Sequence, residues 1–370
     1  MRIAHLDTGR TWRGGQGQVR LLMRELRTAG HGQLLLAPAG PLLEKVAAEG
    51  FDTVRWDTRG ELDVRGVLAA RAALARFAPD IAHLHSAHAH TLGVLAARWA
   101  GVAGVVVSRR VDFRVGANPF SRLKYALPVD RYFCISEGVA AAMRASGVPA
   151  ARLALVPSGI DLAAVEAEAA APAPDLRAWL GLPADAEVVG SVAALEPHKN
   201  HALLLEAAPA VIAARPRAHF VWLGQDDGCG PALLRRRAEL GLEARVHLPG
   251  FRADARALLR QFDLFALSSN EEGLGTSLLD AQCLGVPIVA TAVGGVPEVV
   301  SDGVTGRLVR ELRPEPLAAA LVAALADPVA RAEWAAAGRT AVQAFGIART
   351  ASRTLAEYRA VLAARGVTPR

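Results

Sequence analysis

The chain has 370 residues, of which 52% are hydrophobic and 21% charged, so it is expected to be globular and large enough for two domains. Its three cysteines, Cys134, Cys229 and Cys283, are too scattered for a disulfide framework or a CxxC metal site, which favours a reducing compartment. Asp7 and Arg10 stand where a secretory signal needs an apolar run, and no apolar stretch reaches the roughly 18–20 residues of a bilayer span. We therefore expect neither a secreted nor a transmembrane protein.

The formal net charge of +6 is unevenly distributed. Residues 1–170 contain 21 Lys and Arg against 15 Asp and Glu, whereas residues 171–370 contain 21 of each. The excess indicates either an arginine-rich composition without function or a first domain that meets an anionic partner, such as a phosphate-bearing substrate or a membrane surface. Nucleic acid is not expected as a partner, because aromatic residues make up only 5% and no recognition motif is present.

In the first half, apolar runs alternate with amphipathic stretches, as in βαβ units with a parallel sheet. Residues 1–7 predict a strand, a glycine-rich loop follows, and Val19, Leu22, Met23 and Leu26 have the spacing of one helix face. Further strands are predicted at 33–37, 80–85, 104–108, 131–136 and 153–158.

The second half repeats this alternation, after a segment rich in Ala and Pro that predicts a linker with the boundary near residues 165–180. Its strands are predicted at 187–195, 218–224, 245–250, 263–269 and 287–291, and residues 327–364 are expected to be helical with a break at Phe345 and Gly346. Two doubly wound α/β domains would bind ligands in a cleft at the carboxyl ends of their strands.

The loop at 271–276 is the strongest candidate for a binding site. Gly273 and Gly275 let backbone N–H groups approach a ligand, and the helix that follows would offer its N-terminus to an anion. Glu272 and Asp280 could accept hydrogen bonds from sugar hydroxyls. The alternative is an ordinary capped turn with one surface acid.

Several ordered motifs add to this loop: AQCLGVPIVAT, GGVPE and DGVTG after it, and TWRGGQGQ, VPSGIDL and SVAALEPHKN before it. Together they resemble the retaining glycosyltransferases of family 4 (group 1), which have the GT-B fold. The resemblance implies two Rossmann-like domains facing a cleft: an acceptor domain at 1–170, a nucleotide-sugar domain at 171–346, and a C-terminal helix at 347–370 that packs back on the first domain.

The resemblance also implies roles for single residues. Lys199 would contact the diphosphate, Glu272 the sugar ring and Asp280 the ribose. The donor would further contact Gly14, Gly15, Gly224, Leu248, Gly250, Gly273, Leu274, Gly275 and Thr276. Glu272, Lys199, His85 and Arg110 would be the catalytic residues, and Arg13, His88, Arg109 and Arg110 would bind the acceptor. No metal or other cofactor is expected, and no DxD motif stands at a plausible strand end.

The sequence departs from the family at three points. Members of the family have a second Glu eight residues after the first, whereas this chain has Asp280 eight residues after Glu272. Ala193 and Ala194 replace the usual diphosphate-binding Arg, and Arg109 and Arg110 stand where a His is common. Arg13, Arg109 or Arg110 could supply the missing charge; alternatively, these arginines bind the acceptor or pair with Asp112.

Four histidines between residues 83 and 90 have three possible interpretations. A metal site would need all four side chains to converge, so a strand-end histidine that touches substrate, His85 or His88, is favoured over a metal; a packed or solvated histidine is the alternative.

The function expected from the resemblance is transfer of a sugar, with retention, from a nucleoside-diphosphate sugar to a glycan or lipid-linked acceptor in bacterial cell-envelope polysaccharide or lipopolysaccharide synthesis. The acceptor is expected to carry phosphate or to lie at an anionic membrane, and the protein to be cytoplasmic or peripheral at the inner face of the cell membrane. The alternatives are a GT-B epimerase, a sugar-phosphate synthase, or a weakened relative that only binds the nucleotide sugar.

Overall fold

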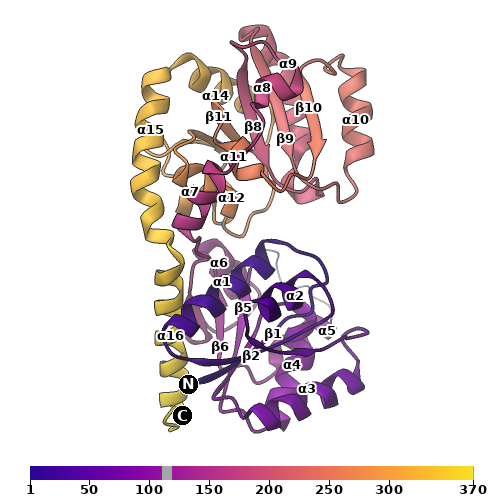
Figure 1. Ribbon diagram of the computed structural model, residues 1–370, viewed down its shortest axis with the longest axis vertical. Coiled ribbons are helices and arrows are strands. Elements are labelled where there is room, and N and C mark those ends of the chain that lie inside the picture. Colours follow the sequence, from indigo (N-terminus) through magenta and orange to yellow (C-terminus); the bar gives the residue numbers. More distant parts are fainter. Residues whose placement is uncertain (111–118, 370) are drawn as a thin grey trace. The chain divides into compact units, whose positions relative to one another are not determined.

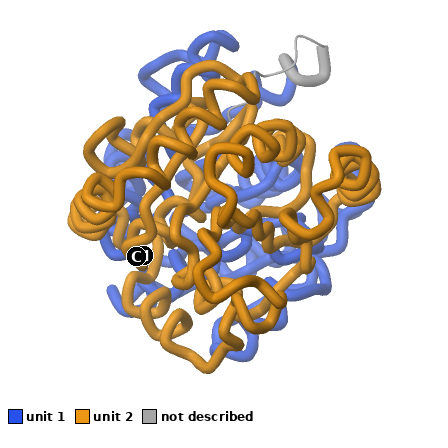
Figure 2. Tube along the Cα trace, turned by 90° about the horizontal axis from the view of Figure 1, so that it is seen from above, with its two compact units in different colours: residues 1–159, 347–370 blue, residues 160–346 orange. Residues whose placement is uncertain are grey.

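The computed structural model describes residues 1–110 and 119–369, apart from the side chains of residues 119–122. It divides into two compact units, which Figure 2 distinguishes by colour. Unit 1 comprises Met1–Gly159 together with Ile347–Arg370, and unit 2 comprises Ile160–Gly346. Among the described helices, none has both the length and the apolar character needed to cross a bilayer.

Unit 1 is built on a seven-stranded parallel sheet with the order β3-β2-β1-β4-β5-β6-β7 (Figure 1). Its strands are β1 (Arg2–Leu6), β2 (Gly32–Ala37), β3 (Asp52–Arg55), β4 (Ile81–Leu84), β5 (Gly104–Arg109), β6 (Arg131–Cys134) and β7 (Leu153–Leu155). The strand order reverses direction between β1 and β4, the kind of position at which open α/β sheets bind ligands.

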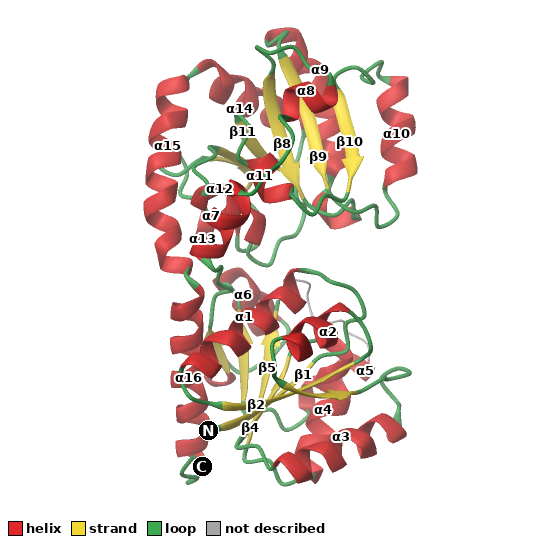
Figure 3. Ribbon diagram, viewed as in Figure 1, coloured by secondary structure: helices red, strands yellow, loops and turns green. Residues whose placement is uncertain are grey.

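Seven α-helices are described in unit 1, and Figure 3 draws helices in red. They are α1 (Gly14–Thr28), α2 (Pro41–Ala48), α3 (Val64–Phe77), α4 (Ala87–Trp99), α5 (Pro119–Ala126), α6 (Glu137–Ala145) and, from the end of the chain, α16 (Ile347–Ala364), with the short 3-10 turn η1 (Ala150–Arg152) besides.

Helix α16 completes the core of unit 1, although it comes from the far end of the sequence. Its apolar face packs with α1 and the sheet in one buried cluster: Ile3, Leu22, Leu26, Ile81, Val106, Phe133, Ala154, Val156, Ala351, Leu355, Tyr358, Val361 and Leu362. Gly159 allows the chain to approach this helix, because a Cβ there would lie 2.8 Å from the Cα atom of Ile347. The spacing of Leu355, Tyr358 and Leu362 thus reflects a buried stripe, as the sequence predicts.

Unit 2 has a six-stranded parallel sheet with the order β10-β9-β8-β11-β12-β13. Its strands are β8 (Glu187–Val192), β9 (Ala218–Leu223), β10 (Val246–Gly250), β11 (Leu264–Leu267), β12 (Ile288–Thr291) and β13 (Arg307–Val309). Its helices are α7 (Leu162–Ala170), α8 (Leu176–Leu180), α9 (His201–Ala214), α10 (Gly230–Glu239), α11 (Ala255–Leu259), α12 (Thr276–Cys283), α13 (Val296–Val299), α14 (Pro314–Ala326) and α15 (Pro328–Ala341), with the 3-10 turns η2 (Pro197–Lys199) and η3 (Val342–Phe345).

The segment predicted as a linker is folded into unit 2, and the first unit ends at Gly159 and not at residue 170. Alanine is the best helix former, and two aspartates cap the helices in this segment. Asp161 accepts a hydrogen bond from the Ala164 N–H at 3.0 Å, and Asp175 accepts one from the Ala178 N–H at 2.7 Å. The predicted break at Phe345 and Gly346 coincides with the end of η3, directly before α16.

These boundaries sharpen the charge asymmetry. Unit 1 has 26 Lys and Arg against 13 Asp and Glu, a net charge of +13, whereas unit 2 has 16 against 23, a net charge of −7. The division at residue 170 understates the difference because it counts three acids of α7 and its cap with the first part and the basic α16 with the second.

Candidate functional site

In unit 2, the predicted donor residues Lys199 and Glu272 form an ion pair. Lys199 ends η2, which follows β8, and Glu272 lies in the loop that follows β11. These two strands are neighbours at the point where the strand order reverses, which is where open α/β sheets bind ligands. The Lys199 Nζ atom donates to the Glu272 Oε2 atom at 2.5 Å, and both side chains are largely buried.

The loop that carries Glu272 is held from three sides. The Glu272 Oε2 atom also accepts a hydrogen bond from the Ser269 hydroxyl at 3.3 Å, and the Glu272 carbonyl accepts one from the Gly295 N–H at 2.9 Å. Thr291 donates to the Ser269 carbonyl at 2.7 Å. The carboxylate is therefore positioned by the loops after β11 and β12 before any ligand binds.

Gly275 starts α12 in a conformation that favours glycine. Its φ is +82°, and a Cβ atom would lie 2.8 Å from the Leu278 Cδ1 atom. No described side chain caps this helix, and N–H groups at a helix start that lack an intrahelical partner favour a nearby anion. Gly273, Leu274 and Thr276 lie in the same loop and first turn, as the sequence predicts.

Asp280 is engaged by an arginine that the sequence analysis misses. Arg256 on α11 donates from Nε to Asp280 Oδ2 at 3.3 Å and from a terminal nitrogen to Oδ1 at 3.1 Å. Arg256 also donates to Glu168 on α7 at 2.8 Å. Burial raises the pKa of Asp280, and Arg256 opposes that shift. Asp280 thus ties α12 to α11, and its contact with ribose stays a prediction.

The remaining donor residues of unit 2 lie at the ends of β9 and β10. The Gly224 N–H donates to the Gly250 carbonyl at 3.0 Å, and Leu248 lies within β10. A Cβ atom on Gly224 would lie 1.8 Å from the Ala193 carbonyl oxygen, so glycine is required where these backbones meet. The Ala193 backbone therefore packs directly against Gly224.

In unit 1, Arg110 brings together three segments that the sequence singles out. Its terminal nitrogens lie 3.3 Å from His85 Nδ1 and 3.5 Å from the Ser158 hydroxyl, and its Cδ atom lies 3.7 Å from where a Cβ of Gly15 would stand. Gly14 and Gly15 begin α1, with Arg13 as its N-cap. Burial lowers the pKa of Arg110 to about 10, and Asp7 opposes this shift.

The histidines predicted to lie on one face do so, but with a third partner from β1. His5, His83 and His85 are buried, and one nitrogen of each lies within 4.8 Å of the others, the spacing of a metal site. Every ring nitrogen already has a protein partner: His5 bonds Gln33 and His85, His83 bonds Tyr358 and Ser108, and His85 also bonds Arg110. This arrangement fits a hydrogen-bonded network better than a ligand set, and the expectation of no metal stays a prediction.

A pocket of about 200 Å³ lies beside Arg110 within unit 1. Arg109, Arg110, Lys124 and Tyr125 line it, together with the start of α4. Burial lowers the pKa of His90 to about 3, and the nearby Lys124 and Arg109 act in the same direction. His88, in the first turn of α4, is exposed and does not line the pocket. Asp112, the alternative partner for the arginines, lies outside the described residues.

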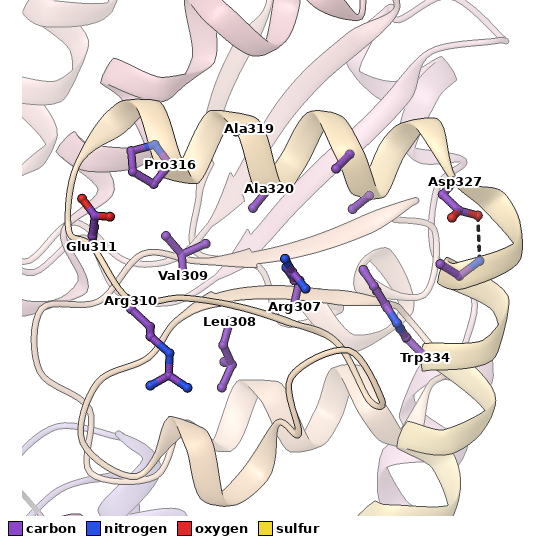
Figure 4. A pocket seen from close by; sticks show the side chains of 13 residues that line it. Arg307, Leu308, Val309, Arg310, Glu311, Pro316, Ala319, Ala320, Asp327 and Trp334 are labelled. Carbon is purple, nitrogen blue, oxygen red and sulfur yellow. Dashed lines mark hydrogen bonds between the residues drawn. The ribbon is translucent and has the colours of Figure 1, made fainter.

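A larger cavity of about 460 Å³ opens elsewhere in unit 2, between β13, α14 and the start of α15 (Figure 4). Arg307, Trp334 and several alanines line it. It contains none of the predicted donor residues, so its size does not make it the candidate site.

Sequence reasoning missed His5, Gln33, Ser158, Tyr358 and Arg256. A signal was available for two of them, because His5 and Gln33 interrupt the apolar strands β1 and β2 with polar side chains. Tyr358 and Arg256 reach the site from helices, and only the tertiary packing brings them there.

Two family models match the chain. The model described as Glycosyltransferase Family 4 matches residues 12–164, and the model described as Glycosyl transferases group 1 matches residues 186–327. The chain belongs to the family 4, or group 1, glycosyltransferases. The two matched regions carry the sites in unit 1 and unit 2 respectively.

Curated relatives of this family include two D-inositol 3-phosphate glycosyltransferases. The Kineococcus radiotolerans protein is 36% identical over 249 residues, which cover 60% of this chain and 56% of the relative. The Mycobacterium bovis protein is 38% identical over 169 residues, which cover 44% of this chain and 34% of the relative. The matched part thus spans about half or less of the length of these relatives.

Solved structures share the fold over nearly the whole chain. Anabaena HepE in complex with UDP has a TM-score of 0.84 at 21% identity, with 97% of this chain and 100% of that chain covered. A Rickettsia africae glycosyltransferase has a TM-score of 0.86 at 16% identity, with 98% of both chains covered. The predicted GT-B fold, with two Rossmann-like units, is confirmed; a cleft between the units stays a prediction.

Proposed function

We propose that this family 4 protein is a retaining glycosyltransferase that transfers a sugar from a nucleoside-diphosphate sugar to a hydroxyl group. The observation that carries the proposal is the Lys199–Glu272 pair beside the uncapped start of α12, at the reversal of strand order in unit 2. A cation, a carboxylate and free backbone N–H groups match the diphosphate and the hydroxyl groups of such a donor. HepE has been solved with UDP and with UDP-glucose, which supports a uridine nucleotide as the first donor to try.

The chemistry assigned to these residues is electrostatic. As the bond between sugar and phosphate breaks, negative charge grows on the leaving diphosphate. Lys199 and the N–H groups of α12 stabilise this charge in place, while Glu272 orients the sugar through its hydroxyl groups. Arg110 and His85 belong to unit 1, and the proposal assigns them to the acceptor. In a front-face displacement the leaving phosphate takes the proton of the acceptor hydroxyl, and no metal is required.

The acceptor is proposed to carry a phosphate group. Unit 1 has a net charge of +13, and its pocket brings Arg109, Arg110 and Lys124 together. Relatives named for D-inositol 3-phosphate support an acceptor of this kind. A lipid-linked phosphate at the inner face of the cell membrane, in cell-envelope synthesis, carries the same chemistry.

The donor proposal is tested by measuring binding of UDP-, GDP-, ADP- and CDP-linked sugars. One of them, at a hundred times its Kd, should raise the free energy of unfolding by about 2.7 kcal/mol. Lys199→Ala should weaken binding of that nucleotide sugar about tenfold or more, because a charge-assisted hydrogen bond contributes about 1.5–3 kcal/mol. The matched control Arg236→Ala removes an exposed cation that pairs with Glu206 on the outside of unit 2, and it should bind as the unchanged protein does.

The donor assignment fails if no nucleotide sugar raises the melting temperature and Lys199→Ala changes nothing. Product analysis with the bound donor then separates the reaction classes. Transfer with an unchanged anomeric configuration supports the proposal. An epimerised nucleotide sugar formed without acceptor would identify an epimerase. Binding without turnover on either phosphorylated or unphosphorylated acceptors would identify a protein that only binds the nucleotide sugar.

A further inference from the structure

Four polar side chains form a continuous hydrogen-bonded row across four neighbouring strands of unit 1. The row runs from Gln33 on β2 to His5 on β1, then to His85 directly after β4 and Arg110 directly after β5. His5 Nε2 lies 3.1 Å from Gln33 Oε1, and His5 Nδ1 lies 3.0 Å from His85 Nε2. His85 Nδ1 lies 3.3 Å from a terminal nitrogen of Arg110. The first three side chains are buried.

The direction of every bond in this row follows from its two ends. Gln33 donates from Nε2 to the Met23 carbonyl of α1 at 2.8 Å, which leaves Oε1 as an acceptor. His5 must therefore donate from Nε2, and as a neutral ring it accepts at Nδ1. His85 must then donate from Nε2 and accept at Nδ1, where the Arg110 guanidinium, which can only donate, completes the row.

Neutral rings are what this environment favours. Burial lowers the pKa of His5 to about 4, and burial with the neighbouring His83 lowers the pKa of His85 well below its ordinary value. His83 is held apart from the row by its own bonds to Tyr358 at 2.6 Å and Ser108 at 2.7 Å. The two histidines of the row thus each carry one proton, on the nitrogen that the row requires.

Arg110 is the end of the row that remains available to a ligand. It lines the 200 Å³ pocket of unit 1, and its Nε atom has no hydrogen-bond partner within the part of the chain that the structure describes. A buried guanidinium nitrogen without a partner is costly unless a ligand or water satisfies it. Arg109, Lys124 and the start of α4 line the same pocket.

We propose that Gln33, His5 and His85 are positioning residues whose one-way row of hydrogen bonds fixes the guanidinium of Arg110 for an anionic group of the acceptor. This inference rests on the proposed function, because it assigns the acceptor to unit 1. The proposed function does not say what orients Arg110. We infer that Gln33, which lies two strands away from His85, determines this orientation together with the pocket residues.

The first test is spectroscopic and needs no acceptor. In the full chain with isotope-labelled histidines, long-range proton–nitrogen spectra should show His5 and His85 as neutral rings protonated at Nε2. Gln33→Leu removes the acceptor of His5 and should change the proton position of His85 as well. A metal ion bound by the histidines in the purified protein, or a His85 signal that ignores Gln33→Leu, would overturn the proposal.

The second test is a double-mutant cycle with inorganic phosphate and D-inositol 3-phosphate as probes. Gln33→Leu and Arg110→Gln should each weaken probe binding about tenfold, and the double variant should bind no more weakly than Arg110→Gln alone. If the fold-loss of probe affinity in the double variant equalled the product of the two single losses, Gln33 would act independently of Arg110 and the proposal would be wrong. Binding of the nucleotide sugar, which tests the donor site of unit 2, should be unchanged throughout.

Two further variants separate positioning from folding. Gln33→Glu keeps a hydrogen-bond acceptor for His5, but its negative charge favours a second proton on the His5 ring. The Nδ1–H of that ring would then point at the Nε2–H of His85 and break the row. Gln33→Glu should therefore weaken probe binding as Gln33→Leu does. Gln282→Leu removes a buried glutamine of unit 2 that also donates to a carbonyl, that of Val299. It should cost stability but leave the His85 signal and probe binding unchanged. If Gln282→Leu weakened the probes equally, the effect of Gln33→Leu would be one of general stability.

Discussion

Buried histidines are the residues whose charge depends most directly on the fold. Burial lowers the pKa of His201 to about 4 and that of His219 to about 4, from an ordinary 6.5, and His90 and His5 shift in the same direction. Folding thus keeps these rings neutral where the unfolded chain would protonate them. The unfolded state binds more protons between the two pKa values, so the free energy of unfolding falls as the pH drops from 6.5 towards 4.

His201→Gln should make this pH dependence shallower. Each histidine that stays neutral in the folded state lowers the free energy of unfolding by about 1 kcal/mol for each pH unit of acidification in this window. The variant should therefore lose that much of the slope between pH 6 and pH 5. Urea unfolding at a series of pH values measures it. His88→Gln removes an exposed histidine of α4 and serves as the control. A stability that does not change between pH 7 and pH 5 would contradict the prediction.

At the scale of elements, α16 joins unit 1 although the whole of unit 2 precedes it in the chain. The buried cluster that it forms with α1 and the sheet includes Leu362, which is fully buried, and the Tyr358 hydroxyl reaches His83 at 2.6 Å. Unit 1 is therefore incomplete without the last helix, and the hydrogen-bonded histidines beneath it depend on its position.

Leu362→Ala should destabilise unit 1 by about 2–5 kcal/mol, because it removes buried methyl groups and leaves a cavity. Leu68→Ala on α3 removes the same atoms from a side chain that is 47% exposed and should change stability far less. Calorimetry of both variants resolves the two units if they unfold separately. Equal melting temperatures for the two variants would show that α16 does not hold unit 1 together.

The sequence predicts most elements because their patterns are local, and it fails where tertiary packing decides. The parallel strands with continuous apolar runs are found, whereas the edge strands β3 and β13 are missed, since they are short and partly exposed. Lys199 and Glu272 follow from their motifs, but their mutual ion pair does not. The bond between Asp280 and Arg256 joins α12 to α11, and no spacing in the sequence indicates it.

At the scale of the whole molecule, the opposite charges of the two units give them different electrostatic tasks. Unit 2 carries −7 and yet holds the proposed diphosphate site, so that site must act through local groups, namely Lys199 and the start of α12. Unit 1 carries +13, a charge that would attract the proposed anionic acceptor over a longer range. Salt screens exposed charges beyond about 8–10 Å but affects buried contacts much less.

Raising the salt concentration should therefore weaken acceptor binding more than donor binding. Between about 0.05 and 0.5 M sodium chloride, the affinity for D-inositol 3-phosphate, used as the acceptor probe, should fall more steeply than the affinity for the nucleotide sugar. Titration calorimetry at a series of salt concentrations measures both in the same protein. Arg65 and Arg71 are exposed on α3 of unit 1 and do not line the pocket. Replacing both with Gln lowers the positive charge of unit 1, so it should reduce the salt dependence of acceptor binding and leave that of donor binding unchanged. Equal slopes for donor and acceptor would show that the +13 of unit 1 reflects composition and not recognition.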